Sequence, residues 1–156
     1  MKKLIILLSL ISFNAIGAGT SSSTDDSSET PDQIITLYKL AEKHIDNQSY
    51  DKSLKLLKKL TKREDLGTKR ADIYNLLGFS YRKLENPDLD KSFAAYMMAI
   101  EIDPSHLGAH EYLGELYLMR DQKDKAVIIL KKLDQLAGSN TEEYRELKIA
   151  IDEYQS

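Results

Sequence analysis

A short motif that recurs at a fixed distance limits what this chain of 156 residues can fold into. Leucine followed by a small residue, with a ring-bearing residue three positions later, occurs three times at intervals of 37 and 36 residues. The copies are Leu40-Ala41 with His44, Leu77-Gly78 with Tyr81, and Leu113-Gly114 with Tyr117. Around them apolar residues recur with helical spacing, and no stretch of useful length alternates as a strand would. The period predicts stacked copies of one helical unit, because a single unit cannot bury its apolar face.

Each copy is followed by a second helical stretch, in which a small residue precedes larger apolar ones. The residues concerned are Ser53, Leu57 and Leu60, then Ser92, Tyr96 and Ala99, and finally Ala126, Leu130 and Leu133. Pro104 follows the second of these stretches and Gly138 follows the third. Small residues on facing positions predict two antiparallel helices that approach closely within each unit.

These residues resemble the tetratricopeptide repeat, whose pattern is W-x2-L-G-x2-Y, then A-x3-F, then a closing proline. The middle copy carries Tyr74 at the tryptophan position and two extra residues in its turn around Asn86-Pro87-Asp88. The third copy has His110 there, and the first is degenerate, with Leu37 there and no closing proline. The resemblance covers about residues 33–138. It implies an all-α fold, a right-handed α-α superhelix of three helix pairs with a C-terminal capping helix.

We place the three repeats at about 32–66, 68–104 and 105–138, and the capping helix within 139–156. In the last segment Tyr144, Leu147, Ile151 and Tyr154 fall on one face, with charged residues elsewhere, as in a terminal helix that is apolar only toward its neighbours. Several side chains are predicted to cap these helices. They are Ser49, Asp88, Ser105 and Asp121 as N-caps, and Ser139 with Glu142 as a capping box.

The first 18 residues have the composition of a secretory signal peptide. Lys2 and Lys3 precede an apolar run over 4–16, and Ala15, Gly17 and Ala18 offer a cleavage site after residue 17 or 18. The run is shorter than the roughly 20 apolar residues that span a bilayer, so an uncleaved anchor is the disfavoured alternative. We therefore expect an exported protein with no stable membrane span, periplasmic or else secreted.

Residues 19–31 are predicted to form a disordered tether, because eight of the thirteen are Ser or Thr, three are acidic and none is a large apolar residue. Loss of Lys2 and Lys3 with the signal changes the formal charge from −3 to −5. That charge disfavours nucleic acid as a partner, since binding it requires neutralising phosphates. The absence of cysteine excludes disulfides, thiol catalysis and a lipid anchor on cysteine.

The resemblance places a partner-binding groove on the concave side, along the first helix of each repeat. The lining residues it implies are Tyr38, Glu42, Ile45, Asp72, Asn75, Phe79, Arg82, Lys83, Glu111, Glu115, Leu118 and Met119. Family members that clamp a C-terminal carboxylate use Lys, Asn and Arg at positions that here hold Tyr38, Glu42, Leu76, Glu111 and Glu115. Since two of the basic places are acidic, we predict that this groove does not capture C-terminal carboxylates. Phe79 and Leu118 have an equally supported alternative as core residues.

Two further groups of residues are candidates for function. His106 and His110 are four residues apart, a spacing that lets two imidazoles bind one metal ion, but no third ligand is apparent. A run of basic residues on the second helix of the first repeat could dock on a membrane or an acidic partner, although such runs more often only solvate a surface. The run comprises Lys52, Lys55, Lys58, Lys59, Lys62 and Arg63.

No nucleophile–base order, phosphate-binding glycine loop or H-E-x-x-H motif is present in the sequence. We therefore predict no enzymatic activity and no cofactor. The expected function is an exported protein- or peptide-binding scaffold that helps to organise an envelope complex, similar in layout to short repeat proteins of Gram-negative envelopes. The alternative is an accessory metal- or redox-handling protein that uses His106 and His110. Association of two copies through an open end of the stack is a further alternative.

Overall fold

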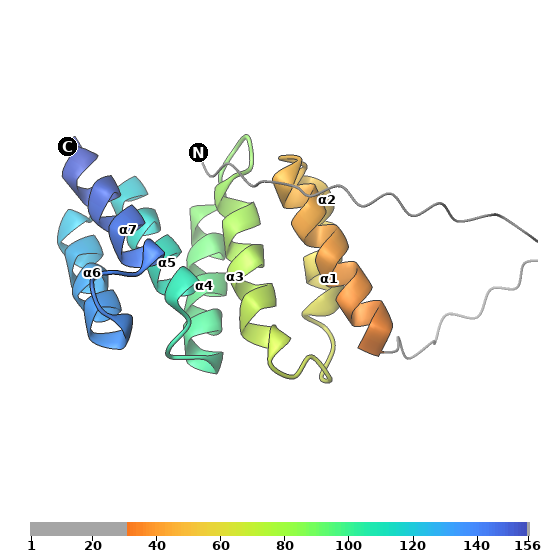
Figure 1. The fold of residues 1–156 in the computed structure, drawn as a ribbon. Helices are drawn as coiled ribbons and strands as arrows, with labels where there is room; N and C mark the ends of the chain where they lie inside the picture. The colour runs from red at the N-terminus through yellow and green to blue at the C-terminus, as the bar shows by residue number, and fades with distance from the viewer. Residues whose placement is uncertain (1–30, 156) are drawn as a thin grey trace, which may run out of the picture.

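The computed structural model describes residues 31–155, which form seven helices and, within that range, no strand (Figure 1). The helices are α1 (Pro31–Asp46), α2 (Tyr50–Leu60), α3 (Lys69–Arg82), α4 (Leu89–Ile102), α5 (Leu107–Met119), α6 (Lys123–Ala137) and α7 (Glu142–Glu153). The predicted all-α fold of three helix pairs and a final helix is confirmed. The predicted signal peptide and residues 19–30 of the predicted tether lie outside the described residues.

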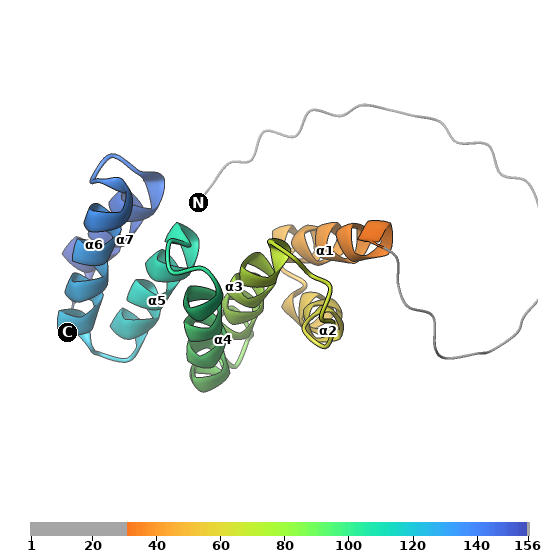
Figure 2. The same cartoon turned by 90° about the horizontal axis from the view of Figure 1, so that it is seen from below.

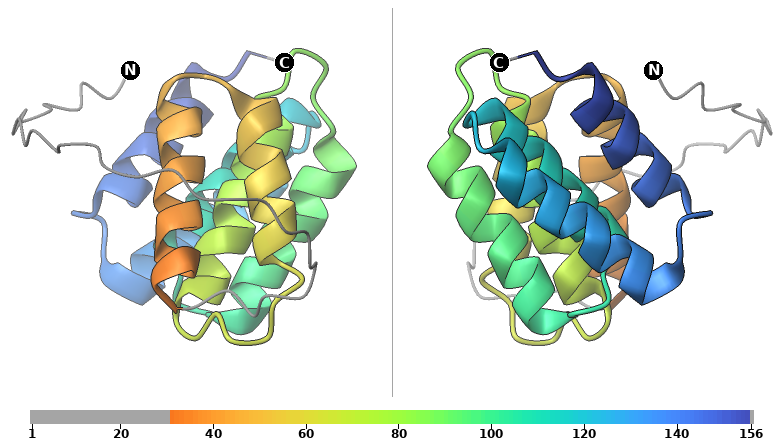
Figure 3. Two further views of the ribbon diagram at one scale, coloured as in Figure 1. Left: turned by 90° about the vertical axis from the view of Figure 1, so that its right-hand side faces the viewer. Right: turned by 90° about the vertical axis from the view of Figure 1, so that its left-hand side faces the viewer.

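The helices pack mainly against their neighbours in sequence, so the molecule is a row of antiparallel pairs. α1 pairs with α2, α3 with α4, and α5 with α6, while α7 packs against both α5 and α6. The row curves, with α1, α3, α5 and α7 along the inner side of the arc and α2, α4 and α6 along the outer side (Figure 2). Figure 3 views the two ends, with α1 and α2 at one and α6 and α7 at the other. We call the two sides the inner face and the outer face.

The small residues of the second helices are buried, as the close approach of each pair requires. Ser53, Ser92 and Ala126 are all fully buried. The Ser92 hydroxyl donates to the Gly78 carbonyl oxygen at 2.9 Å, which joins α4 to α3. The Ser80 hydroxyl donates to the Ser53 hydroxyl at 3.2 Å, which joins α3 to α2 of the preceding pair. These two hydrogen bonds give the hydroxyls of Ser53, Ser80 and Ser92 partners within the core.

The two glycines of the motif serve different contacts. A Cβ atom on Gly78 would lie 2.6 Å from the ring of Tyr96 on α4, so this glycine admits the second helix of its own repeat as predicted. The sequence predicts the same role for Gly114, close approach of the second helix of its own repeat. The nearest atoms there belong instead to Leu147 of α7, with Cδ2 at 2.5 Å from the position a Cβ would take. Gly114 therefore accommodates the final helix.

The apolar residues of the second helices form most of the predicted core. Leu57, Leu60, Tyr96, Ala99 and Leu133 are all completely buried, and Leu130 packs partly buried against the cluster that contains Leu133. Burial of this apolar area drives the stacking, because each pair covers the exposed side of the one before it. Among residues 31–155 no helix combines the length and apolar character needed to cross a bilayer.

The helix caps differ in part from the sequence predictions. Asp88 caps α4 as expected, accepting a hydrogen bond from the Lys91 amide at 3.0 Å, and Gly138 ends α6 with a φ of 82°. The predictions at Ser105, Asp121 and Ser139 are wrong. Their places are taken by the residues one or two positions later, which are His106 for α5, Gln122 for α6 and Thr141 for α7. Ser105 instead bonds the Asp103 carboxylate, and Asp121 adopts a left-handed turn with φ 56°.

Candidate functional site

The structure divides the predicted lining residues of the inner face by their exposure. Those that are exposed are Lys83 and Met119; those that are partly buried are Tyr38, Glu42, Ile45, Asp72, Phe79 and Glu115; and those that are buried are Asn75, Arg82, Glu111 and Leu118. The inner face therefore offers fewer side chains to a partner than the sequence spacing implied.

For Leu118 the sequence supported groove lining and core equally, and the structure places it in the core. It is 7% exposed and packs in one cluster with Ala126, Leu133 and Leu147. The physical reason is that α6 and α7 both close over α5, so the apolar side of α5 is covered. Asn75, Arg82 and Glu111 are likewise too buried to make the first contact with a partner. Spacing alone could not separate these positions from exposed ones.

Arg82 and Glu115 form an ion pair that joins α3 to α5 across the middle of the inner face. The Arg82 guanidinium lies over the rings of Phe79 and Tyr112, with its central carbon 5.6 and 5.2 Å from the two centroids. Burial acts to lower the pKa of Arg82, but Tyr96 and Glu115 outweigh it, so that the pKa is raised. The charge of Arg82 is thus held in the structure and is not available to a ligand.

Phe79 sits inside an aromatic cluster and is only partly open to solvent. Its ring centroid is 6.2 Å from that of Tyr50 on α2 and 5.1 Å from that of Tyr112 on α5. The Lys83 ammonium lies 5.6 Å from the Phe79 centroid. Such edge-on and tilted contacts are typical of stable aromatic packing. Phe79 consequently contributes to the joint between repeats, which was the core alternative stated for it.

A small hollow opens on the inner face between α1 and α3. It has a volume of about 330 Å³ and is lined by Glu42, Ile45, Asp46 and Leu76, and we call it the α1–α3 notch. The sequence had named Glu42 and Ile45 as lining residues and Leu76 only as a place where a clamp residue is missing. Asp46 was not predicted, although it directly follows Ile45 at the end of α1.

Tyr38 lies one helical turn before the α1–α3 notch. Burial, together with the carboxylates of Glu42 and Asp72, raises the pKa of Tyr38 far above its ordinary value, so the hydroxyl stays protonated. Glu42 shares a side-chain hydrogen bond with this hydroxyl, and the Lys69 ammonium lies 5.0 Å from the ring centroid. These contacts fix the orientation of Tyr38 beside the notch.

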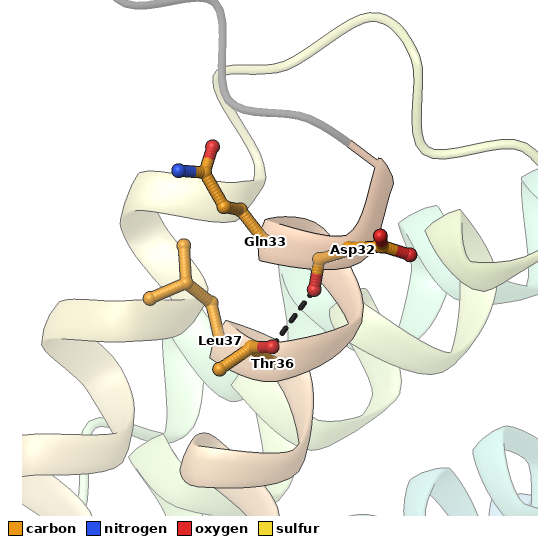
Figure 4. A pocket seen from close by; sticks show the side chains of 4 residues that line it. All are labelled: Asp32, Gln33, Thr36 and Leu37. Atoms are coloured by element: carbon orange, nitrogen blue, oxygen red, sulfur yellow. Dashed lines mark hydrogen bonds between the residues drawn. The ribbon is translucent and has the colours of Figure 1, made fainter. Parts of the chain in front are cut away.

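A second hollow lies at the beginning of α1, at the end of the row. It is lined by Asp32, Gln33, Thr36 and Leu37 and has a volume of about 300 Å³ (Figure 4). The Thr36 hydroxyl donates to the Asp32 carbonyl oxygen at 2.8 Å within the same helix. Its apolar lining is supplied chiefly by Leu37, which also packs against the core cluster of the first repeat. This hollow therefore lies at the N-terminal end of the described helices.

The two histidines considered as metal ligands both serve the structure. His106 Nδ1 accepts from the Ala109 amide at 3.1 Å and its Nε2 lies 3.2 Å from Asp72 Oδ1, so His106 caps α5 and ties it to α3. His110 Nε2 donates to the Pro104 carbonyl oxygen at 3.0 Å. Within residues 31–155 no three side chains of the His, Asp, Glu or Cys types are grouped to hold a metal ion. The metal-handling alternative gains no support from this arrangement.

Four of the six residues of the predicted basic run lie on α2, on the outer side of the arc, whereas Lys62 and Arg63 follow the end of that helix. Lys52, Lys55, Lys58 and Lys62 are exposed, and Arg63 forms an ion pair with Asp65 at 2.7 Å. The Lys58 ammonium lies 5.2 Å from the Tyr81 ring centroid, so this lysine makes a cation–π contact within the molecule. The structure thus places the basic charge on the outer face, opposite the acidic notch.

Comparison with known proteins identifies the fold. No family model matches the chain. Tetratricopeptide repeat protein 37 of Xenopus laevis is 34% identical over 92 residues, which are 59% of this chain but only 6% of that relative. Among solved structures, MamA is similar with a TM-score of 0.63 at 23% identity, over 78% of this chain and 68% of MamA.

Two similar structures contain peptides. The Yersinia enterocolitica type III secretion chaperone SycD, in complex with a peptide of the translocator YopD, has a TM-score of 0.66 at 18% identity, over 81% of this chain and 92% of that one. The first TPR domain of Spaghetti (RPAP3), bound to the HSP90 peptide SRMEEVD, has a TM-score of 0.65 at 14% identity, over 79% and 94% of the two chains. At these identities the likeness concerns the fold.

Proposed function

We propose that this chain binds a partner protein or peptide on its inner face and performs no catalysis. Its sequence repeats and its fold are those of a tetratricopeptide-repeat protein. The observation that carries the proposal is the α1–α3 notch, which combines partly buried apolar side chains with carboxylates on the inner side of the arc. Two proteins of similar fold hold peptides, which supports a binding role for this fold. A concave surface with a few placed polar groups is the usual form of a binding site.

The proposed place of action is the bacterial periplasm, where the protein would help to organise an envelope complex. The support is the N-terminal sequence, in which Lys2 and Lys3 precede an apolar run and small residues follow it. Edman sequencing of the protein isolated from the periplasmic fraction should begin at Ala18 or Gly19. A protein recovered from the cytoplasm with residues 1–18 intact would contradict export.

The proposed ligand is not a C-terminal carboxylate. Glu111 and Glu115 occupy two places where carboxylate-clamping relatives carry basic residues, and Glu115 is already paired with Arg82. Because Glu111 is buried and Glu115 is paired, these two places offer a free carboxylate none of the basic side chains of such a clamp.

A photo-crosslinking experiment tests the inner face directly. Replacing Met119, which is 47% exposed on α5, with a photoreactive amino acid should yield a crosslinked partner in intact cells. The matched control is the same replacement at Ile128, which is 63% exposed on α6 of the outer face and should yield none. Equal products at both positions, or a product only at Ile128, would contradict the proposal. A product made of two copies of this chain would support self-association instead.

A further inference from the structure

We propose that the α1–α3 notch binds the apolar side chain of a peptide segment in which lysine or arginine flanks that side chain. This inference rests on the proposed function, and it specifies the chemistry of the partner. Four described residues supply the site: Ile45 and Leu76 provide apolar contact, and Glu42 and Asp46 provide charge.

The size of the notch suits one side chain. Its volume of about 330 Å³ is at the lower limit of the roughly 300–1,000 Å³ of small-ligand pockets. Ile45 and Leu76 are both partly buried, so an entering aliphatic or aromatic side chain would cover apolar surface that is now in contact with water. Removing such surface from water is the favourable term in docking.

The two carboxylates are not neutralised by neighbouring cations. Within residues 31–155 neither Glu42 nor Asp46 forms an ion pair. Lys69, whose ammonium lies 5.0 Å from the Tyr38 ring centroid, pairs with Asp72 at 2.9 Å, and Lys83 lies over the Phe79 ring. The notch therefore presents two negative charges beside an apolar floor.

This charge selects between classes of peptide. A lysine or arginine next to the buried side chain would lie beside Glu42 or Asp46, where opposite charges attract. Glutamate or aspartate at the same place would be repelled. The basic residues of α2, which could attract an acidic peptide, lie on the outer face and not beside the notch. An acidic segment would consequently leave the notch empty.

A peptide titration followed by nuclear magnetic resonance tests the inference. Three acetylated and amidated probes share a Gly-X-Gly frame, in which X is Lys-Leu-Lys, Glu-Leu-Glu or Lys-Gly-Lys. With the Lys-Leu-Lys probe we expect shifts of the backbone amide signals of Glu42, Ile45, Asp46 and Leu76. The other two probes should leave these signals in place, since each lacks either the charge or the apolar group.

Variants identify the carboxylates as the cause. The double variant Glu42→Gln/Asp46→Asn keeps the shape of both side chains. It should weaken binding of the Lys-Leu-Lys probe by about fivefold, as expected for the loss of two exposed charge pairs. The matched control is Glu101→Gln with Asp134→Asn, which makes the same change of charge at exposed positions of α4 and α6. The control should bind the probe as the unchanged protein does.

Three results would overturn the inference. The first is that millimolar Lys-Leu-Lys peptide leaves the notch signals in place. The second is that the Glu-Leu-Glu probe shifts these signals as strongly as Lys-Leu-Lys does, and the third is that both double variants weaken binding equally. The proposed function can fail separately. If Met119 still yields a crosslinked partner and the Glu42→Gln/Asp46→Asn protein captures it equally well, the inner face binds a partner but the notch does not recognise it.

Discussion

At the scale of single residues, Gly78 sets how closely α3 and α4 can approach. A Cβ atom there would lie 2.6 Å from the Tyr96 ring, which is fully buried, and 3.1 Å from the Ser92 carbonyl oxygen. Neither neighbour can yield easily, because the ring is enclosed and the carbonyl belongs to a helix backbone. The glycine is therefore required by packing, and it is the best example of a motif residue whose role the sequence predicted.

Replacing Gly78 with alanine should destabilise the protein by about 1–2 kcal/mol, because the overpacking penalty exceeds the gain in helix propensity. The control is Gly108→Ala on α5, where the nearest atom, Asn75 Nδ2, would be at 3.4 Å. That change should be neutral or stabilising by up to about 1 kcal/mol. Urea unfolding followed by circular dichroism measures both. Equal stability of the two variants would contradict this account of Gly78.

His110 shows how a repeat position can hold a titratable group. Burial lowers the pKa of His110 below its ordinary value of 6.5, against the opposing effect of its hydrogen bond to Pro104. A lowered pKa means that, below pH 6.5, the unfolded chain takes up a proton that the folded chain resists. The contribution of His110 to stability is complete above pH 6.5 and is lost as the pH falls below it.

We expect the free energy of unfolding to fall less steeply with acid in His110→Gln than in the unchanged protein. The comparison is made between pH 6.5 and about pH 5, where the folded and the unfolded chain differ in the protonation of His110. Denaturant unfolding at each pH gives the slope. Identical slopes would show that protonation of His110 does not affect the free energy of unfolding, and so would contradict the lowered pKa.

At the scale of the elements, α7 completes the stack and also closes it. Its Leu147 is fully buried against Gly114, so α7 packs on α5 as the first helix of a further repeat would. The next residue, Lys148, stands where the earlier first helices have Ala41, Gly78 and Gly114, and it is exposed and paired with Asp152 at 2.5 Å. A long charged side chain at this position disfavours a close second helix. The polar outer side is that of a capping element.

Leu147→Ala should cost about 2–5 kcal/mol, because it leaves a cavity between α5 and α7. Ile149→Ala, on the same helix but 49% exposed, should change the stability by no more than about 0.5 kcal/mol. Thermal and urea unfolding of both variants provides the measurement. A small effect of Leu147→Ala would mean that α7 docks loosely and does not cap the stack.

The caps show where reasoning by element loses accuracy. Asp88 was predicted correctly because a single polar residue precedes α4 after a turn with proline. Before α5 and α7 two or three residues with capping side chains follow one another, so the sequence alone does not decide among them. The backbone geometry selects His106 and Thr141, each of which accepts a bond from the amide three residues later.

At the scale of the whole molecule, the pair Arg82–Glu115 couples the second and third repeats. Arg82 has a side-chain exposure of 5% and Glu115 one of 27%, so the positive charge depends on its partner. This coupling also means that a substitution at Glu115 alters the stability of the molecule together with its inner face. Variants at Glu42 and Asp46 are cleaner probes of binding, since neither takes part in an ion pair within residues 31–155.

Glu115→Gln should destabilise the protein by about 1–3 kcal/mol, less than for a fully buried pair because Glu115 is 27% exposed. The control is Lys148→Gln, which removes an exposed pair and should cost less than about 0.5 kcal/mol. Unfolding in urea compares the two. If Glu115→Gln costs no more than the control, Arg82 finds sufficient compensation from the aromatic rings alone.

The sequence by itself determined the helical architecture, because the period of 36 or 37 residues and the helical spacing of apolar residues are local properties of the chain. It did not determine which lining residues reach a partner. Only the tertiary structure decided that Leu118 is core, that Phe79 and Arg82 join repeats, and that Asp46 meets Leu76 at one notch. Exposure depends on which helices close over a position, and that packing is set by contacts between residues distant in sequence.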